Sequence, residues 1–101
     1  MLKTFIMSFT KQTPREFTKN NVEILKCEQM GVYGIFKQGE WLYVGRGDIR
    51  QRLLDHLNGD IPGLLASQPT YWVDEVINGD PANREKELII ELNPLHNEKV
   101  G

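Results

Sequence analysis

The sequence predicts an α+β fold in which two strands, a helix, a third strand and a second helix follow a short N-terminal extension. Two β-rich segments flank a glycine-containing turn, and two segments with apolar residues at helical spacing lie on either side of a third β-rich segment. A chain of 101 residues that is 40% hydrophobic has enough apolar content for one modest core. We therefore expect one compact domain, with residues 1–29 as the extension and residues 30–101 as the main body.

The first two strands are predicted at residues 32–36 and 41–44, where β-branched and aromatic residues predominate. Between them, residues 38–40 (Gln-Gly-Glu) have the composition of a hairpin turn. Tyr33 and Tyr43 are therefore expected on neighbouring strands. Within the N-terminal extension, residues 13–16 (Thr-Pro-Arg-Glu) have the form of a capping box, which predicts the start of a short helical turn.

The first helix is predicted from Ile49 to Leu57. Asp48 is a favourable N-cap residue, Gln51 stands at the N3 position, and leucines repeat at helical spacing through the segment. A loop containing glycine and proline follows the helix, and residues 70–77 after this loop are predicted to form the third strand.

A second helix is predicted after the third strand. Asp80 suits its N-cap position and Pro81 suits its first helical position. The apolar stripe and the end of this helix are indicated by Leu88, Ile89, Leu92 and Asn93-Pro94.

The charge of the chain limits how it could bind nucleic acid. A formal net charge of -2 and a pI near 5.6 argue against a broad basic surface. Between residues 74 and 98, acidic side chains outnumber basic ones by seven to two. Any phosphate-binding surface is therefore expected to be local, and the candidates are Arg46, Arg50 and Arg52.

We expect a cytoplasmic protein with no membrane partner. The sequence has neither the run of about 20 apolar residues that a membrane span requires nor the pattern of a signal peptide. Cys27 is the only cysteine, so it cannot form an internal disulfide, which fits a reducing compartment.

Three side chains could supply phosphate chemistry. Arg52 and His56 stand four residues apart and therefore project from one face of the first predicted helix. A guanidinium offers a planar fork of donors to a phosphate, and an imidazole can transfer a proton near neutral pH. Glu85 is a hard oxygen ligand of the kind that Mg²⁺ or Mn²⁺ prefers. Each of these residues taken alone is better explained as part of an ordinary helix surface, so composition leaves the function open.

The ordered set of motifs is more specific than any of its parts. It consists of Gly31-Val32-Tyr33, Tyr43-Val44-Gly45, Arg52, His56, Glu85, Leu88-Ile89, Pro94 and Asn97. Over residues 31–97 this set resembles the GIY-YIG nuclease superfamily, which includes homing endonucleases, junction-cutting endonucleases and the incision subunit of bacterial nucleotide excision repair. The resemblance implies a three-stranded antiparallel sheet flanked by helices, and it identifies residues 30–101 as a GIY-YIG-like nuclease domain.

The resemblance also implies roles for the two tyrosines and for two residues near them. Tyr33 and Tyr43 are expected to face the scissile phosphate, with Tyr33 either accepting a proton or positioning the attacking water. A phenol with a pKa of about 10 needs help from a metal-bound hydroxide, a nearby cation or His56 to act as a base at neutral pH. Asn97 is expected to close the domain through its amide. Arg46, directly after the second motif, is either a phosphate contact or an ordinary charge at a strand end.

In the two helices, the resemblance implies that Arg52 stabilises the transition state, that His56 stands beside it, and that Glu85 holds a single Mg²⁺ or Mn²⁺. Two alternatives remain. The segment before Arg52 is about one residue shorter than in many relatives, so Arg50 competes for the arginine position. Glu87 competes with Glu85 for the metal, although the spacing from Glu85 to Asn97 fits the family better.

We expect a metal-dependent endonuclease that hydrolyses phosphodiester bonds in DNA. The alternatives are a non-catalytic module that binds nucleic acid or protein and a nuclease that acts on RNA. Only about 30 residues lie outside the nuclease motifs, so we expect recognition to depend on DNA shape, a partner protein or a homodimer.

Overall fold

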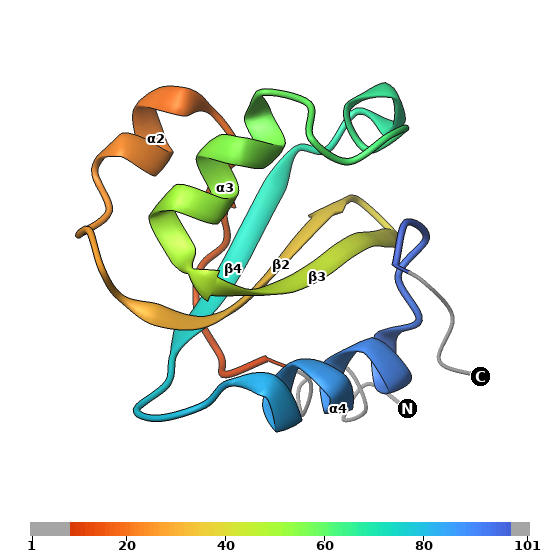
Figure 1. Cartoon of the computed structure of the whole chain (residues 1–101). Coiled ribbons are helices and arrows are strands. Elements are labelled where there is room, and N and C mark those ends of the chain that lie inside the picture. Colours follow the sequence, from red (N-terminus) through yellow and green to blue (C-terminus); the bar gives the residue numbers. More distant parts are fainter. Residues whose placement is uncertain (1–8, 98–101) are drawn as a thin grey trace.

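The computed structural model describes residues 9–97 and has an α+β architecture built on one antiparallel sheet (Figure 1). The helices α2 and α3 lie on one face of this sheet and α4 lies on the other (Figure 1). In chain order, the elements are β1 (Arg15–Glu16), α2 (Lys19–Glu23), β2 (Met30–Lys37), β3 (Glu40–Asp48), α3 (Ile49–Leu57), the 3-10 turn η1 (Leu65–Ser67), β4 (Tyr71–Val76) and α4 (Ala82–Leu92).

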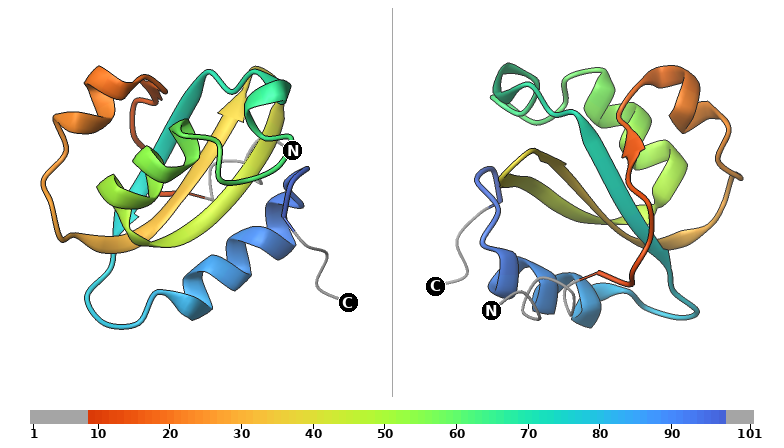
Figure 2. Two further views of the ribbon diagram at one scale, coloured as in Figure 1. Left: turned by 45° about the horizontal axis from the view of Figure 1, so that its top comes forward. Right: turned by 180° about the vertical axis from the view of Figure 1, so that it is seen from behind.

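The predicted α+β class is confirmed, but the predicted number of strands is wrong. The sheet has four strands in the order β1-β4-β2-β3, and the additional strand, β1, comes from the N-terminal extension. Figure 2 shows from behind how this short strand runs beside β4. Arg15 is paired with Trp72 and Glu16 with Tyr71, so β1 satisfies backbone groups along the outer edge of β4.

The predicted helical turn at residues 13–16 is also wrong, because the strand β1 occupies that position. The helix of this region begins later, at Lys19, where the Thr18 hydroxyl accepts a hydrogen bond from the Asn21 backbone N–H at 3.3 Å. Phe17, between the strand and the helix, is buried with its ring edge-on to Trp72. Burial of the Phe17 ring and the backbone pairing of β1 with β4 stabilise the strand more than the capping box would stabilise a helical turn.

The helices of the main body follow the prediction closely. The helix α3 begins at Ile49, and the Asp48 carboxylate accepts a hydrogen bond from the Gln51 backbone N–H at 3.2 Å. The helix α4 begins at Ala82, one residue later than predicted, although the Asp80 carboxylate still accepts from the Ala82 backbone N–H at 2.9 Å. Among residues 9–97, no helix has the length and apolar character needed to cross a bilayer.

Each face of the sheet has its own buried cluster because side chains alternate along the strands. On β2, Val32 packs in the cluster that contains Leu88 of α4, and Tyr33 packs in the cluster that contains Leu53 of α3. Residues before position 30 contribute to both clusters. The cluster on the α3 face contains Phe17, Val22, Tyr33, Ile35, Leu42, Ile49, Leu53, Leu64 and Trp72, and the cluster on the α4 face contains Phe9, Val32, Val44, Val73 and Leu88.

Candidate active site

The hairpin register brings the two motif tyrosines together under α3. Tyr33 on β2 stands opposite Gly45 on β3, and the neighbouring pair on the same face joins Ile35 to Tyr43. A side chain at position 45 would overlap the Tyr33 hydroxyl, because a Cβ there lies only 2.6 Å from Tyr33 Cζ. The absence of a side chain at Gly45 therefore leaves the space through which Tyr33 extends, and the Tyr33 and Tyr43 ring centres are 6.5 Å apart.

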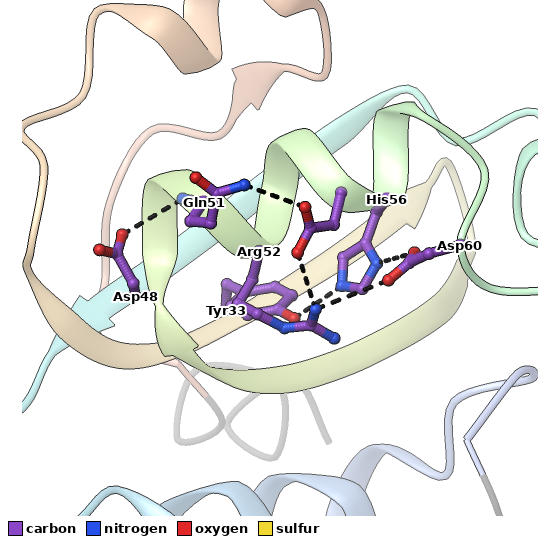
Figure 3. Close-up of polar contacts among 7 residues, drawn as sticks. Tyr33, Asp48, Gln51, Arg52, His56 and Asp60 are labelled. Carbon is purple, nitrogen blue, oxygen red and sulfur yellow. Dashed lines mark hydrogen bonds and ion pairs between the residues drawn. The ribbon is translucent and has the colours of Figure 1, made fainter.

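A chain of hydrogen bonds runs from Tyr33 through His56 to Asp60 (Figure 3). The Tyr33 hydroxyl lies 2.7 Å from His56 Nε2, and His56 Nδ1 lies 2.7 Å from an Asp60 carboxylate oxygen. Tyr33 and His56 are both 0% exposed, whereas the Asp60 side chain is 35% exposed. The chain of hydrogen bonds therefore connects a buried phenol to a carboxylate at the surface.

Burial favours the uncharged form of both ring side chains. Burial raises the pKa of Tyr33 well above its ordinary value, and the Arg52 charge opposes this shift. Burial lowers the pKa of His56 below its ordinary value of 6.5, while the hydrogen bond to Asp60 opposes the shift. The site therefore contains a neutral phenol next to a neutral imidazole, one of whose two ring nitrogens carries no proton.

Arg52 supplies the positive charge of the cluster. Its guanidinium lies 3.0 Å from an Asp55 oxygen and 3.6 Å from an Asp60 oxygen, with 34% of the side chain exposed (Figure 3). Arg50 lies about 200° further round α3 and so points away from the tyrosines. Of the two arginines that compete for this role in the sequence, the structure brings Arg52 to Tyr33 and His56.

The two tyrosines differ in their access to solvent. Tyr33 is fully buried, whereas Tyr43 is partly exposed on β3, which is an edge strand of the sheet. Burial raises the pKa of Tyr43, Arg52 lowers it, and the negative charge of Glu85 raises it further. The surfaces that a ligand can reach first are therefore those of Tyr43 and Arg52.

Glu85 approaches the edge strand from the other side of the sheet. It lies on α4, and its carboxylate is 3.6 Å from the guanidinium of Arg46 on β3. Burial raises the pKa of Glu85, and Arg46 opposes this shift. Glu85 therefore influences Tyr43 electrostatically, but its ion pair within residues 9–97 is with Arg46 and not with Arg52.

Glu85 is the carboxylate that the sequence predicts as a metal ligand. The described part of the chain has no group of three or more His, Cys, Asp and Glu side chains that could hold a metal by themselves. Mg²⁺ often takes one or two protein carboxylates and fills its remaining positions with water and phosphate oxygens. The partly buried carboxylate of Glu85 fits this second kind of site, provided that it exchanges its contact with Arg46.

Asn97 anchors the C-terminal segment to the edge of β3. Its side-chain oxygen accepts from the Val44 backbone N–H at 2.8 Å, and its side-chain nitrogen donates to the Val44 carbonyl at 2.8 Å. The backbone N–H groups of Leu95 and His96 also donate to carbonyls of β3. Asn97 therefore satisfies both backbone hydrogen-bonding groups of Val44, the residue next to Tyr43. It acts on the site through strand β3.

Two acidic residues of the site are missing from the sequence prediction. Asp55 and Asp60 both contact Arg52, and Asp60 also contacts His56. Asp60 belongs to an Asn-Gly-Asp segment that reads as a simple helix stop. Its position four residues after His56 is the one signal that could have indicated a contact.

The buried His56 makes the stability of the protein depend on pH. In the unfolded chain a histidine has a pKa near 6.5, whereas in the folded protein the pKa of His56 is lower. At pH values between these two pKa values, the unfolded state therefore binds more protons than the folded state. We expect the free energy of unfolding, measured with urea, to decrease as pH falls from above about 6.5 through the folded pKa. His56→Gln is expected to show a smaller decrease in the free energy of unfolding. An equal decrease in both proteins would show that His56 is not the source of the pH dependence.

Comparison of the chain with protein-family models, with curated proteins and with solved structures gave no significant match.

Proposed function

We propose that this chain is a metal-dependent nuclease of the GIY-YIG type that hydrolyses phosphodiester bonds in DNA. The observation that carries the proposal is the hydrogen bond between Tyr33 and His56 next to the guanidinium of Arg52. Phosphodiester hydrolysis needs a group that orients water, a group that accepts a proton and a cation that stabilises developing negative charge. A phenol, a neutral imidazole and a guanidinium in one cluster meet these three needs.

In the proposed reaction, an attacking water gives a proton to the Tyr33 hydroxyl oxygen while the Tyr33 phenolic proton passes to His56 Nε2. The water oxygen forms the new bond to phosphorus, and the bond from phosphorus to the leaving oxygen breaks. The leaving oxygen takes a proton from solvent. Arg52 donates hydrogen bonds to the non-bridging oxygens as their negative charge increases.

Access to Tyr33 requires the Arg52 side chain to change partners. In the free protein, Arg52 is paired with Asp55 and Asp60, and the Tyr33 hydroxyl is covered. A phosphate approaching the exposed part of Arg52 competes with these carboxylates for the guanidinium. The exchange places the phosphate beside Tyr43 and opens the route by which water reaches Tyr33.

Glu85 is the residue that would hold Mg²⁺ or Mn²⁺. A divalent ion at this carboxylate would polarise a phosphoryl oxygen and offset the charge of the phosphate. With an ion at Glu85, Arg46 would lose its ion pair with that carboxylate, and its guanidinium could then contact a neighbouring phosphate.

Replacing Glu85 tests the metal assignment. We expect Glu85→Gln to lower the cleavage rate roughly 100-fold at limiting Mg²⁺, with partial recovery as the ion concentration rises, because an amide is a weaker ligand. The matched control is Glu87→Gln on the same helix, where the Glu87 carboxylate is 67% exposed and paired with Arg84. The dependence of the rate on Mg²⁺ is measured by titration of the ion in a cleavage assay. If the two variants depend on Mg²⁺ equally, Glu85 is not the metal ligand.

The proposed activity is tested by incubating the purified protein with plasmid, branched and single-stranded DNA and with RNA. Each substrate is assayed with Mg²⁺, with Mn²⁺ and with EDTA. We expect cleavage of DNA that EDTA abolishes. Cleavage confined to RNA would show that the substrate is RNA and not DNA, while still supporting phosphodiester hydrolysis.

A non-catalytic binding module is the second candidate function. It is favoured by the pairing of Arg52 with two carboxylates and by the complete burial of Tyr33. Such a module would bind nucleic acid or a protein partner through the same surface without breaking a bond. Retained DNA binding, measured by fluorescence anisotropy, together with no cleavage under any metal condition, would establish this alternative.

A further inference from the structure

Asp60 is shared between the two basic side chains of the site (Figure 3). One of its carboxylate oxygens lies 2.7 Å from His56 Nδ1, and the other lies 3.6 Å from the Arg52 guanidinium. The chain turns back after α3 at Gly59, where φ is +87°, and this turn returns Asp60 to the helix. The position of the carboxylate is therefore set by the backbone at the end of α3.

The contact between Asp60 and His56 has a consequence for the proton on the imidazole. An ionised carboxylate can only accept hydrogen bonds, so the ring nitrogen that faces it, Nδ1, must carry the proton. A neutral imidazole has one N–H, and Nε2 is then left with a lone pair. The Tyr33 hydroxyl, 2.7 Å from Nε2, is consequently the donor in its hydrogen bond with His56.

We propose that Asp60 is a positioning residue that fixes the Nδ1–H tautomer of His56, so that Nε2 is the acceptor for the proton of Tyr33. The catalytic consequence of this tautomer rests on the proposed nuclease function, whereas the tautomer itself does not. During attack, one proton moves from water to Tyr33 and one moves from Tyr33 to His56 Nε2. The imidazolium that forms is paired with the Asp60 carboxylate, and it returns its proton to solvent when the reaction is complete.

Asp60→Asn is expected to reverse the tautomer of His56. Arg52 is a donor only, so the amide oxygen of the new side chain turns toward Arg52. The amide nitrogen then faces His56 Nδ1 and donates to it, which moves the imidazole proton to Nε2. The Tyr33 hydroxyl loses its acceptor and can no longer pass a proton to His56.

The experiment is a ¹⁵N-detected NMR measurement of the His56 ring nitrogens in the free protein near pH 7. We expect Nδ1 to carry the proton in the wild type and Nε2 to carry it in Asp60→Asn. The matched control is Asp55→Asn, because Asp55 contacts Arg52 at 3.0 Å and its carboxylate does not bond to His56; this variant should keep the wild-type tautomer. A proton on Nε2 in the wild type, or an unchanged tautomer in Asp60→Asn, would overturn the proposal, and the wild-type spectrum decides it if Asp60→Asn does not fold.

The cleavage assay tests the catalytic consequence separately. Asp60→Asn is expected to lower kcat about 100-fold. His56 is faced by Arg52 and Asp55 of α3, Asp60 of the following loop, Tyr33 of β2 and Tyr43 of β3. Of these groups, Asp60 raises the pKa of His56 most strongly, so its removal should shift the acid limb of any residual kcat profile to lower pH.

The two tests fail in different ways. If the wild type shows the expected tautomer but cleaves no nucleic acid, the nuclease function fails and the role of Asp60 in orienting His56 stands. If the wild type cleaves DNA and Asp60→Asn cleaves it with an unchanged kcat and pH profile, the nuclease function stands and the proposed role of Asp60 in proton transfer is wrong.

Discussion

Replacing Arg52 with alanine is expected to lower the rate of DNA cleavage about 1,000-fold, the largest catalytic effect of any single substitution in the site. The positive charge of Arg52 acts on both tyrosine hydroxyls, and it opposes the effect of burial on both of their pKa values. In the proposed reaction, the negative charge of a pentavalent phosphorus species would form beside Arg52, where partial burial strengthens the interaction. The rate is measured under single-turnover conditions, so that the change reports chemistry and not product release.

Two further variants separate the charge of Arg52 from its shape and position. Arg50→Ala removes the same charge from the opposite side of α3, and we expect a change in rate of less than about 5-fold. Arg52→Lys keeps the charge but loses the planar fork, so an intermediate loss of about 10- to 100-fold is expected. If Arg50→Ala reduces the rate as much as Arg52→Ala, the arginine has been assigned to the wrong position.

Replacing Gly45 with alanine is expected to lower the free energy of unfolding by about 3 kcal/mol or more. A Cβ at this position would overlap the Tyr33 hydroxyl and lie 2.6 Å from Tyr33 Cζ and 3.0 Å from Tyr43 Cε2. Tyr33 is fully buried in the cluster on the α3 face, and Tyr43 packs against that cluster, so the Tyr33 ring cannot move away freely. The substitution should also displace the Tyr33 ring from its place in the site. Urea unfolding monitored by circular dichroism measures the decrease in the free energy of unfolding.

A suitable control for Gly45 is Gly39 in the hairpin turn. Gly39 has a φ of +83°, and no heavy atom lies within 4 Å of the position that a Cβ would occupy. Gly39→Ala therefore measures backbone strain alone, which is expected to cost about 1 kcal/mol. Tyr33→Phe removes the hydroxyl oxygen that a Cβ at position 45 would overlap. Its cost in free energy of unfolding should therefore be smaller when it is added to Gly45→Ala than when it is made in the wild-type protein. If Gly45→Ala is no more destabilising than Gly39→Ala, Tyr33 does not occupy the space beside Gly45.

The predictable parts of the fold are those that local pattern determines. The helix from Ile49 to Leu57 was predicted with its observed bounds because its N-cap at Asp48 and its leucine periodicity agree. The strand β1 was not predicted, because a two-residue strand exists only through its pairing with β4, some 55 residues later. Thr13 and Glu16 have the letters of a capping box, but nothing in their local sequence reports the edge that β4 leaves open.

The candidate site shows the same division between local and tertiary information. The four-residue step from Arg52 to His56 predicts that they share a helix face, and the structure places them together. The complete burial of Tyr33 was not predictable, because strand alternation gives the face of a side chain but not how deeply it is covered. The contact of Asp60 with His56 depends on a turn after the helix, which a sequence pattern marks only as a stop.

The most direct test of the proposed nuclease is single-turnover cleavage of plasmid DNA by the wild-type protein and by Tyr33→Phe in Mg²⁺. The substitution keeps the buried ring but removes the hydroxyl that bonds to His56. We predict that the wild type cleaves the DNA and that Tyr33→Phe, shown to be folded by circular dichroism, cleaves it about 100-fold more slowly. Cleavage by Tyr33→Phe at the wild-type rate, or no cleavage by the wild type, would contradict the proposed site.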